Sequence, residues 1–248
     1  MVAAGSKGIG LAAAKALVAE GCRVSICARG EETLAKACGE IGGGVRGMVA
    51  DVTKAEDLER WMAATVSELG APEIVVTNTG GPPAGTLDTM TDEQWALGFE
   101  STLMNVVRLV RLAAPGMAER GWGRIVHVTS LVALEPNAIL PISSTLRMGL
   151  RALTRLQSDL YAPQGLTVNA VLPGHTLTDR QIHLAELRSE RERITVEQAL
   201  ERQGAAVPVG RLATAAEIGD AIAFLASERA AYISGVSLVV DGGLTRMG

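Results

Sequence analysis

A glycine-rich segment near the start of the chain has the residue types and spacing that bind phosphate groups. This segment, Ala3–Gly10, reads AAGSKGIG, and an alanine-rich helix is predicted directly after it, over Leu11–Glu20. Glycines there allow the backbone to approach a pyrophosphate, whose charge is stabilised by the helix N-terminus. A β-branched run over Arg23–Cys27 follows, so the segment indicates a dinucleotide site.

Two cations near this segment bear on which dinucleotide is bound. An NAD enzyme commonly has an acidic residue at the end of the second strand, where it accepts hydrogen bonds from the ribose. Here that stretch ends in Arg29, and Lys7 lies in the glycine loop. Two cations would suit a ribose 2′-phosphate, although both could be ordinary surface cations. We therefore expect NADP(H) to be preferred over NAD(H).

The elements that must position this site alternate between strand and helix along the chain. Short β-branched runs predict strands over Arg23–Cys27, Val45–Ala50, Ile74–Asn78, Arg124–Thr129, Leu166–Leu172 and Val236–Asp241. Capping boxes predict helix starts at Thr53…Glu56, Thr91…Gln94, Thr195…Gln198 and Thr214…Glu217. Several strands are continuously apolar, which is typical of parallel strands buried on both faces. We expect an α/β doubly wound parallel sheet, a Rossmann fold of about seven strands with helices on both faces.

We expect residues 1–248 to form a single dinucleotide-binding domain, because no linker or composition break divides them. Residues 179–204 are dense in charge and lie where a strand-to-helix connection is usually short. They are either a solvated surface helix or a lid, and their position favours a substrate lid. Only Met1 and Val2 stand where a first strand should be, so that strand is short or the natural chain begins earlier.

Composition excludes several classes of protein. A net charge of −4 and the lack of a basic stripe argue against a nucleic-acid partner. No apolar run is long enough to cross a membrane, and no Cys or His spacing predicts a metal site. Cys22, Cys27 and Cys38 are expected to be reduced thiols of a cytoplasmic protein.

Motifs along nearly the whole chain resemble those of the short-chain dehydrogenase/reductase family. Ala3–Gly10 resembles its TGxxxGxG loop, with Ala3 and Ala4 in place of the threonine and the first glycine. Further matches are Asp51-Val52, Asn78-Thr79-Gly80 for NNAG, Pro173-Gly174 with Thr178, and Val240-Asp241-Gly242-Gly243. The resemblance implies a small carbonyl or alcohol substrate and a homotetramer or homodimer. The residues expected at the cofactor are Gly5, Ser6, Lys7, Gly8, Ile9, Gly10, Arg29, Asp51, Val52, Asn78, Gly80, Arg147, Pro173, Gly174, Thr176 and Thr178.

The resemblance also implies a catalytic set of Asn, Ser, Tyr and Lys. Ser130 ends the strand that matches the family strand with the catalytic serine. Family spacing places the tyrosine position at Ser143, the lysine position at Arg147 and the asparagine position at Thr102, so the Tyr-xxx-Lys pair is lacking.

These replacements change the chemistry. A tyrosine phenol has a pKa near ~10, which a neighbouring cation can tune, whereas a serine hydroxyl is far less acidic and shorter by a ring. Ser143 therefore cannot take over the proton transfer unchanged. Arg147 can bind ribose hydroxyls but stays protonated, so it cannot relay protons as lysine does.

Three other residues are candidates for the missing proton donor. Tyr161 lies near a helix end and is expected to be a packing residue, and His127 is expected to be a structural histidine inside a strand. His175 follows Pro173-Gly174 on the nicotinamide side and could act as a general acid. Water is the other candidate.

The leading hypothesis is an NADP(H)-dependent oxidoreductase acting on a carbonyl/alcohol pair, with Ser130 as donor to the substrate oxygen. The alternative is a catalytically inactive relative that binds a dinucleotide or a partner protein. Arginine at the lysine position also resembles halohydrin dehalogenases, but those relatives keep the tyrosine and lose the nucleotide loop.

Overall fold

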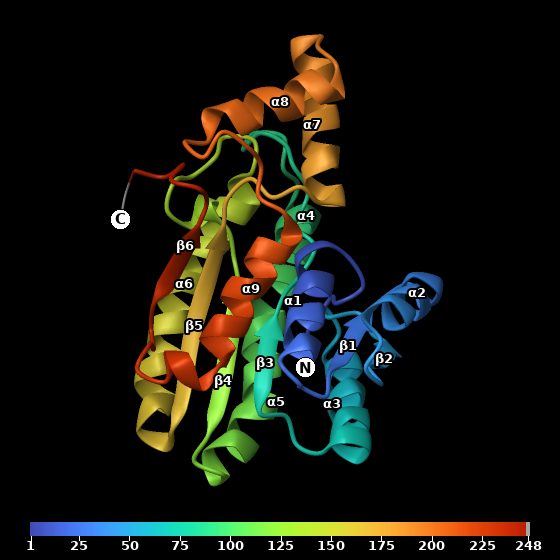
Figure 1. Cartoon of the computed structure of the whole chain (residues 1–248). Helices are drawn as coiled ribbons and strands as arrows, with labels where there is room; N and C mark the ends of the chain where they lie inside the picture. Colours follow the sequence, from blue (N-terminus) through green and yellow to red (C-terminus); the bar gives the residue numbers. More distant parts are fainter. Residues whose placement is uncertain (247–248) are drawn as a thin grey trace.

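The β-branched runs form parallel strands at the centre of the protein (Figure 1). The computed structural model describes residues 1–246. Its strands are β1 (Ser25–Ala28), β2 (Arg46–Val49), β3 (Ile74–Thr77), β4 (Gly123–Val128), β5 (Leu166–Pro173) and β6 (Ser237–Val240). Every residue of β4 and β5 is buried, as expected for strands covered on both faces.

Val2 occupies the position of a first strand in the sheet. It bridges in parallel to Ile26 of β1 and to Val76 of β3, and thereby joins the pair β1–β2 to the four strands β3–β4–β5–β6. The resulting order, β2-β1-Val2-β3-β4-β5-β6, is the predicted doubly wound parallel sheet. Six regular strands and this short bridge correspond to the seven expected.

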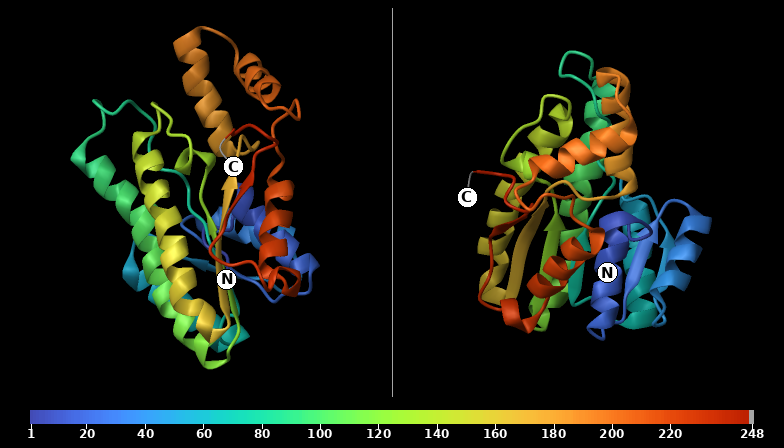
Figure 2. Two further views of the ribbon diagram at one scale, coloured as in Figure 1. Left: turned by 90° about the vertical axis from the view of Figure 1, so that its left-hand side faces the viewer. Right: turned by 45° about the horizontal axis from the view of Figure 1, so that its top comes forward.

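Helices cover both faces of the sheet (Figure 2). They are α1 (Gly8–Ala19), α2 (Glu31–Ile41), α3 (Ala55–Leu69), α4 (Asp92–Phe99), α5 (Asn105–Glu119), α6 (Pro141–Tyr161), α7 (Asp179–Glu192), α8 (Val196–Ala206) and α9 (Ala215–Ala226). One face is packed by α1, α2 and α9, and the other by α3, α5 and α6.

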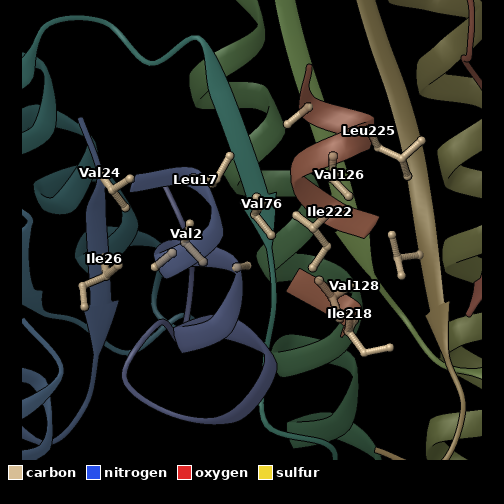
Figure 3. Close-up of a cluster of buried hydrophobic side chains, with 14 of the residues drawn as sticks. Val2, Leu17, Val24, Ile26, Val76, Val126, Val128, Ile218, Ile222 and Leu225 are labelled. Carbon is tan, nitrogen blue, oxygen red and sulfur yellow. The ribbon is translucent and has the colours of Figure 1, made fainter. Parts of the chain in front are cut away.

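The core on the α1/α9 face is built from branched aliphatic side chains (Figure 3). Val2, Val76 and Val126 project from adjacent strands toward Leu17 of α1 and Ile222 of α9. Burying each such side chain contributes about 1.5–3 kcal/mol. This packing holds α1, and with it the glycine loop, against the sheet.

Three of the four predicted capping boxes are present, at Thr91, Thr195 and Thr214. The box predicted at Thr53 is wrong, because α3 is capped by Lys54 without a side-chain bond. Thr53 donates instead from its backbone N–H and its hydroxyl to Oδ1 of Asp51, at 3.0 and 2.9 Å. The carboxylate of Asp51 therefore binds the Thr53 hydroxyl, which is then not available to cap α3.

The helix after the glycine loop also begins earlier than predicted. α1 starts at Gly8 rather than Leu11, so the last glycine of the loop, Gly10, lies inside its first turn. At the same edge of the sheet, α7 and α8 stand above the carboxyl ends of the strands, at the top of Figure 1. No helix among residues 1–246 is long and apolar enough to cross a membrane.

Candidate functional site

A cleft of about 1270 Å³ opens at the carboxyl ends of the strands, below α7. It is lined by the glycine loop, by the ends of β1, β3, β4 and β5, by the start of α6 and by α7. Open parallel sheets bind ligands at this edge. The predicted site residues in its wall are Ser6, Lys7, Gly8, Ile9, Arg29, Asp51, Val52, Asn78, Gly80, Ser130, Ser143, Arg147, Pro173, Gly174, His175, Thr176 and Thr178.

The glycine loop presents backbone donors to this cleft. Lys7 is the N-cap of α1 and makes no side-chain cap bond, so the N–H groups of the first turn are not satisfied by a capping side chain. Free N–H groups at a helix N-terminus favour a phosphate. Gly8 has a φ of +51°, which a residue with a side chain adopts only with strain.

Gly5 and Gly10 lie outside the cleft wall and act through packing instead. A Cβ on Gly5 would lie 2.7 Å from Cγ2 of Ile26, and one on Gly10 would lie 2.4 Å from the carbonyl oxygen of Ala4. Glycine at these positions therefore permits the helix and strand to approach closely. Asn78, at the end of β3, pins the loop by donating from Nδ2 to the carbonyl oxygens of Ala3 and Ala4, at 3.3 and 3.2 Å.

The two cations expected near the adenosine both line the cleft. Arg29 is exposed just after β1. Lys7 is also exposed, but its Nζ lies 3.1 Å from Oδ2 of Asp179 at the start of α7. This ion pair connects the glycine loop to α7. Asp51 lies on the same side, where its carboxylate orders the turn that leads to Thr53.

The three polar residues expected at the reacting end share one wall of the cleft. Arg147, on α6, is buried, and its Nε donates to Oγ of Ser143 at 3.1 Å. Its Nη1 donates to the carbonyl oxygen of Val128 at the end of β4, also at 3.1 Å. Ser130 follows β4, and its Oγ accepts a long bond from N of Val132 at 3.4 Å. Burial and the charge of Arg180 lower the pKa of Arg147 to about 10, so its guanidinium remains charged at neutral pH.

Thr102 occupies a different environment from these residues. It lies in a short π-helix, Glu100–Met104, between α4 and α5, and its side chain is buried without a hydrogen-bond partner among residues 1–246. The same holds for Oδ1 of Asn105. Thr102 does not line the cleft, whereas its neighbour Ser101 does. π-Helical turns are frequent at functional sites.

The end of β5 also contributes to the wall of the cleft. Gly174 has no room for a Cβ, which would lie 2.6 Å from Cβ of Asp241. Thr178 is the N-cap of α7, and its Oγ1 accepts from N of Gln181 at 3.4 Å. His175 lines the cleft, and burial together with the charge of Arg188 lowers its pKa, so its ring is neutral at pH 7.

His127 is the buried structural histidine that the sequence predicted. Its Nδ1 is 2.9 Å from Oγ1 of Thr77 on β3, and its Nε2 is 2.8 Å from Oε1 of Gln157 on α6. Both ring nitrogens are therefore satisfied, and burial lowers the pKa of His127 to about 4. Tyr161 packs against the α3/α5/α6 core, and Tyr232 is fully exposed. Neither tyrosine of the chain lines the cleft.

The sequence predicts residues 179–204 as a lid but singles out no arginine of α7 for the cleft wall. Arg180, Arg188 and Arg191 all line it. The available signal was the charge density of residues 179–204, which was recognised without assigning any single arginine. In the part of the chain that the structure describes, no cluster of His, Cys, Asp or Glu could hold a metal ion.

Known proteins are similar to this chain along nearly its whole length. The family described as enoyl-(acyl carrier protein) reductase matches residues 3–245. A putative ketoacyl reductase of Streptomyces coelicolor is 34% identical over 249 residues, which cover 98% of this chain and 95% of the relative.

Two solved structures superpose closely. An actinorhodin polyketide ketoreductase variant with NADPH has a TM-score of 0.95 and 33% identity, and the match covers 99% of this chain and 96% of that one. An NADPH-bound short-chain oxidoreductase of Pseudomonas aeruginosa PAO1, described as containing an atypical catalytic center, has a TM-score of 0.89 and 32% identity, and the match covers 100% and 96% of the two chains.

Proposed function

Because this chain belongs to the short-chain dehydrogenase/reductase family and is an oxidoreductase, we propose that it interconverts a carbonyl compound and an alcohol with NADP(H). We further propose that its reacting centre is non-standard, with Ser143 and Arg147 at the positions of the usual tyrosine and lysine. The observation that carries this is the 3.1 Å bond from Nε of Arg147 to Oγ of Ser143 in the wall of the cleft.

The cleft fits a dinucleotide. The uncapped first turn of α1 and the left-handed Gly8 form a cradle for the pyrophosphate. Asp51 and Val52 would contact the adenine side, and Asn78 and Gly80 would support the middle of the cofactor. The residues that would hold the nicotinamide side are Arg147, Pro173, Gly174, Thr176 and Thr178. When bound, NADPH supplies the hydride.

Two hydroxyls are suited to bind the substrate oxygen. Oγ of Ser143 accepts from the Arg147 guanidinium, which leaves its own O–H free to donate toward the cleft. Ser130 adds a second hydroxyl from the end of β4. Two such donors stabilise the negative charge that develops on a carbonyl oxygen, as an oxyanion hole does. The proton that completes the alcohol comes from water, and His175 is the alternative donor only at a pH low enough to protonate its ring, since its pKa is lowered.

The choice of NADP(H) over NAD(H) rests on charge. Lys7 and Arg29 both line the adenosine side of the cleft, and Arg29 directly follows β1, whereas Glu31 and Glu32 further on do not line the cleft. Lys7 would exchange its exposed partner Asp179 for a 2′-phosphate at little cost, because an exposed ion pair contributes only about 0–1 kcal/mol.

We also propose that residues 1–248 act as one dinucleotide-binding domain with residues 179–204 as its lid. The ion pair of Lys7 with Asp179, and the bond from Nη2 of Arg180 to the carbonyl oxygen of Pro82 at 2.7 Å, connect this lid to both sides of the cleft. A homo-oligomer is expected from the family. A cytoplasmic location is supported by three free cysteines.

The second candidate function is a dinucleotide-binding protein without turnover. It is favoured by one observation, that neither tyrosine of the chain lines the cleft. Thr102 would then be a structural residue, whereas in the catalytic proposal its buried hydroxyl supports a water near the reacting centre.

Turnover separates the two functions. We expect NADPH to be consumed above a boiled control across a panel of ketones, aldehydes and quinones. Ser143→Ala should lower kcat/KM by roughly 100-fold, because it removes a donor to the developing oxyanion. Thr145→Ala, which removes an exposed hydroxyl from the same helix outside the cleft, should change little.

Tight NADPH binding without turnover on any substrate would favour the binding protein. Equal rates for Ser143→Ala and wild type would remove Ser143 from the reacting centre, and unchanged turnover in His175→Ala would leave water as the proton source.

A further inference from the structure

The charges in the cleft wall are distributed unevenly. Two carboxylates line it among residues 1–246, and both are on the cofactor side: Asp51 follows β2, and Asp179 is paired with Lys7. The wall that carries Ser143 has no carboxylate in the described chain, but it has two guanidinium groups, those of Arg147 and Arg180. The reacting end of the cleft is therefore positively charged.

Arg180 reaches across the cleft from the first turn of α7. Its Nη2 donates to the carbonyl oxygen of Pro82 at 2.7 Å, and its Nε lies 3.3 Å from the place where a Cβ on Gly81 would stand. Pro82 in turn neighbours α6, because a Cβ on Gly98 would touch both Pro82 and Ile142. These contacts hold the guanidinium against the Gly81-Pro82 segment, which packs toward α6.

No described carboxylate neutralises this pair of cations. Neither Arg147 nor Arg180 forms an ion pair in residues 1–246; Arg147 is buried and Arg180 is half-buried. Both guanidinium groups line the same cleft, and the charge of Arg180 lowers the pKa of Arg147. Facing like charges in a poorly solvated site are costly unless an anion joins them.

Arg188 and Arg191, two further arginines of the lid, differ from Arg180 because each of them forms an ion pair. Arg188 and Arg191 line the cleft, but both are paired with Glu192, at 2.9 and 3.2 Å. Both therefore share one carboxylate, whereas Arg180 has none among residues 1–246. Arg180 keeps donors available for a ligand, since a guanidinium has five N–H groups and only one bond from Arg180 occurs among the described residues.

We propose that the substrate is an oxo acid whose carboxylate is bound by Arg180, beside Arg147, while its carbonyl oxygen faces Ser130 and Ser143. The inference rests on the proposed function and narrows its substrate class. In the reduction, the carbonyl carbon accepts a hydride from NADPH, the C=O π pair moves to oxygen, and one proton from water completes the hydroxyl. A hydroxy acid and NADP⁺ result, and the carboxylate is unchanged.

The test compares each acid with its uncharged methyl ester: 2-oxobutanoate, 3-oxobutanoate and 4-oxopentanoate. In wild type, kcat/KM for at least one acid should exceed that for its ester by about 10- to 100-fold, the size of a charge-assisted hydrogen bond. Arg180→Gln keeps a donor for Pro82 but removes the charge, and should abolish this ratio. Arg180→Lys should restore part of it.

Arg155→Met is the matched control. It also removes one positive charge, but from the exposed side of α6 outside the cleft, and should leave the ratio as in wild type. A second readout avoids turnover: with saturating NADP⁺, the preferred acid should raise the Tm of wild type but not of Arg180→Gln.

Three outcomes would overturn the inference. Equal kcat/KM for acids and esters would leave the proposed function standing and remove the carboxylate site. A loss of NADPH affinity in Arg180→Gln as large as the loss for the acid would assign Arg180 to the cofactor phosphates. If nothing is turned over, the proposed function fails, and equal Tm shifts by the acid in wild type and Arg180→Gln would then refute the anion site as well.

Discussion

Ala4 is the residue at which the glycine loop departs most clearly from an unstrained backbone. Its φ is +46°, in the left-handed region that favours glycine, and the family motif that it resembles has glycine there. The loop keeps this conformation because Asn78 holds the carbonyl oxygens of Ala3 and Ala4. A side-chain contact from β3 therefore compensates for an unfavourable residue in the cofactor cradle.

We expect Ala4→Gly to stabilise the protein. Relief of the left-handed conformation contributes about 1–2 kcal/mol, and the greater freedom of glycine in the unfolded chain offsets about 0.4–1 kcal/mol of it. The net gain of roughly 1 kcal/mol corresponds to an increase in Tm of about 2–4 °C. Ala3→Gly is the control, because Ala3 is buried with a negative φ, and it should lower the Tm. A lower Tm for both variants would contradict the strain argument.

At the scale of elements, His127 connects β4, β3 and α6 through its hydrogen bonds. It lies on β4 and bonds to Thr77 of β3 and Gln157 of α6, the helix that carries Ser143 and Arg147. The neutral imidazole fills this position, since burial lowers its pKa to about 4. The strand that precedes Ser130 and the helix that carries Arg147 are thus connected by a group that must stay uncharged.

This arrangement predicts a pH dependence of stability. The pKa of His127 falls from about 6.5 in the unfolded chain to about 4 when folded, so its contribution is complete above pH 6.5 and is lost as the pH falls toward 4. Between pH 7.5 and 5 we expect the free energy of unfolding to decrease by about 2 kcal/mol through this group, measured by urea titration.

His127→Gln should reduce the change in the free energy of unfolding between pH 7.5 and 5, whatever its effect on stability at pH 7.5. His183→Gln is the control, because His183 is an exposed residue of α7. An unchanged slope in His127→Gln would assign the effect to other titrating groups.

At the scale of the whole molecule, the cleft is assembled from segments distant in sequence. The glycine loop and α1 form one side, the ends of β4 and β5 and the start of α6 form the other, and α7 lies over both (Figures 1 and 2). A cofactor that contacts several of these segments stabilises the folded protein, because it binds the assembled site and not the unfolded chain.

Cofactor binding should therefore raise the Tm, and NADPH more than NADH. At a concentration 100 times its Kd, NADPH should stabilise the protein by about 2.7 kcal/mol. Arg29→Gln should weaken NADPH binding by roughly 10-fold without affecting NADH, because it removes a charge-assisted bond to the 2′-phosphate. Arg23→Gln, at the opposite end of β1, is the control. Equal shifts by NADPH and NADH in wild type would refute the preference.

Several elements of this protein can be predicted from its sequence alone, because the interactions that form them join residues close together in the chain. Glycine spacing at Gly8 and Gly10 predicts the phosphate loop, continuous apolar runs predict buried parallel strands, and threonine with Gln or Glu in the next turn predicts three helix starts. The exception at Thr53 has a local cause as well, since Asp51 supplies a better acceptor.

Only the tertiary structure decided which distant side chains meet. Arg180 and Arg147 line the same cleft, and Asn78 bonds to Ala4, although long stretches of chain separate the partners. No periodicity predicts such contacts, because they depend on how the helices pack against the sheet and on which residues that packing removes from water. For that reason the sequence indicated a cofactor and a missing tyrosine, while the pair of arginines at the Ser143 end of the cleft could be identified only in the folded chain.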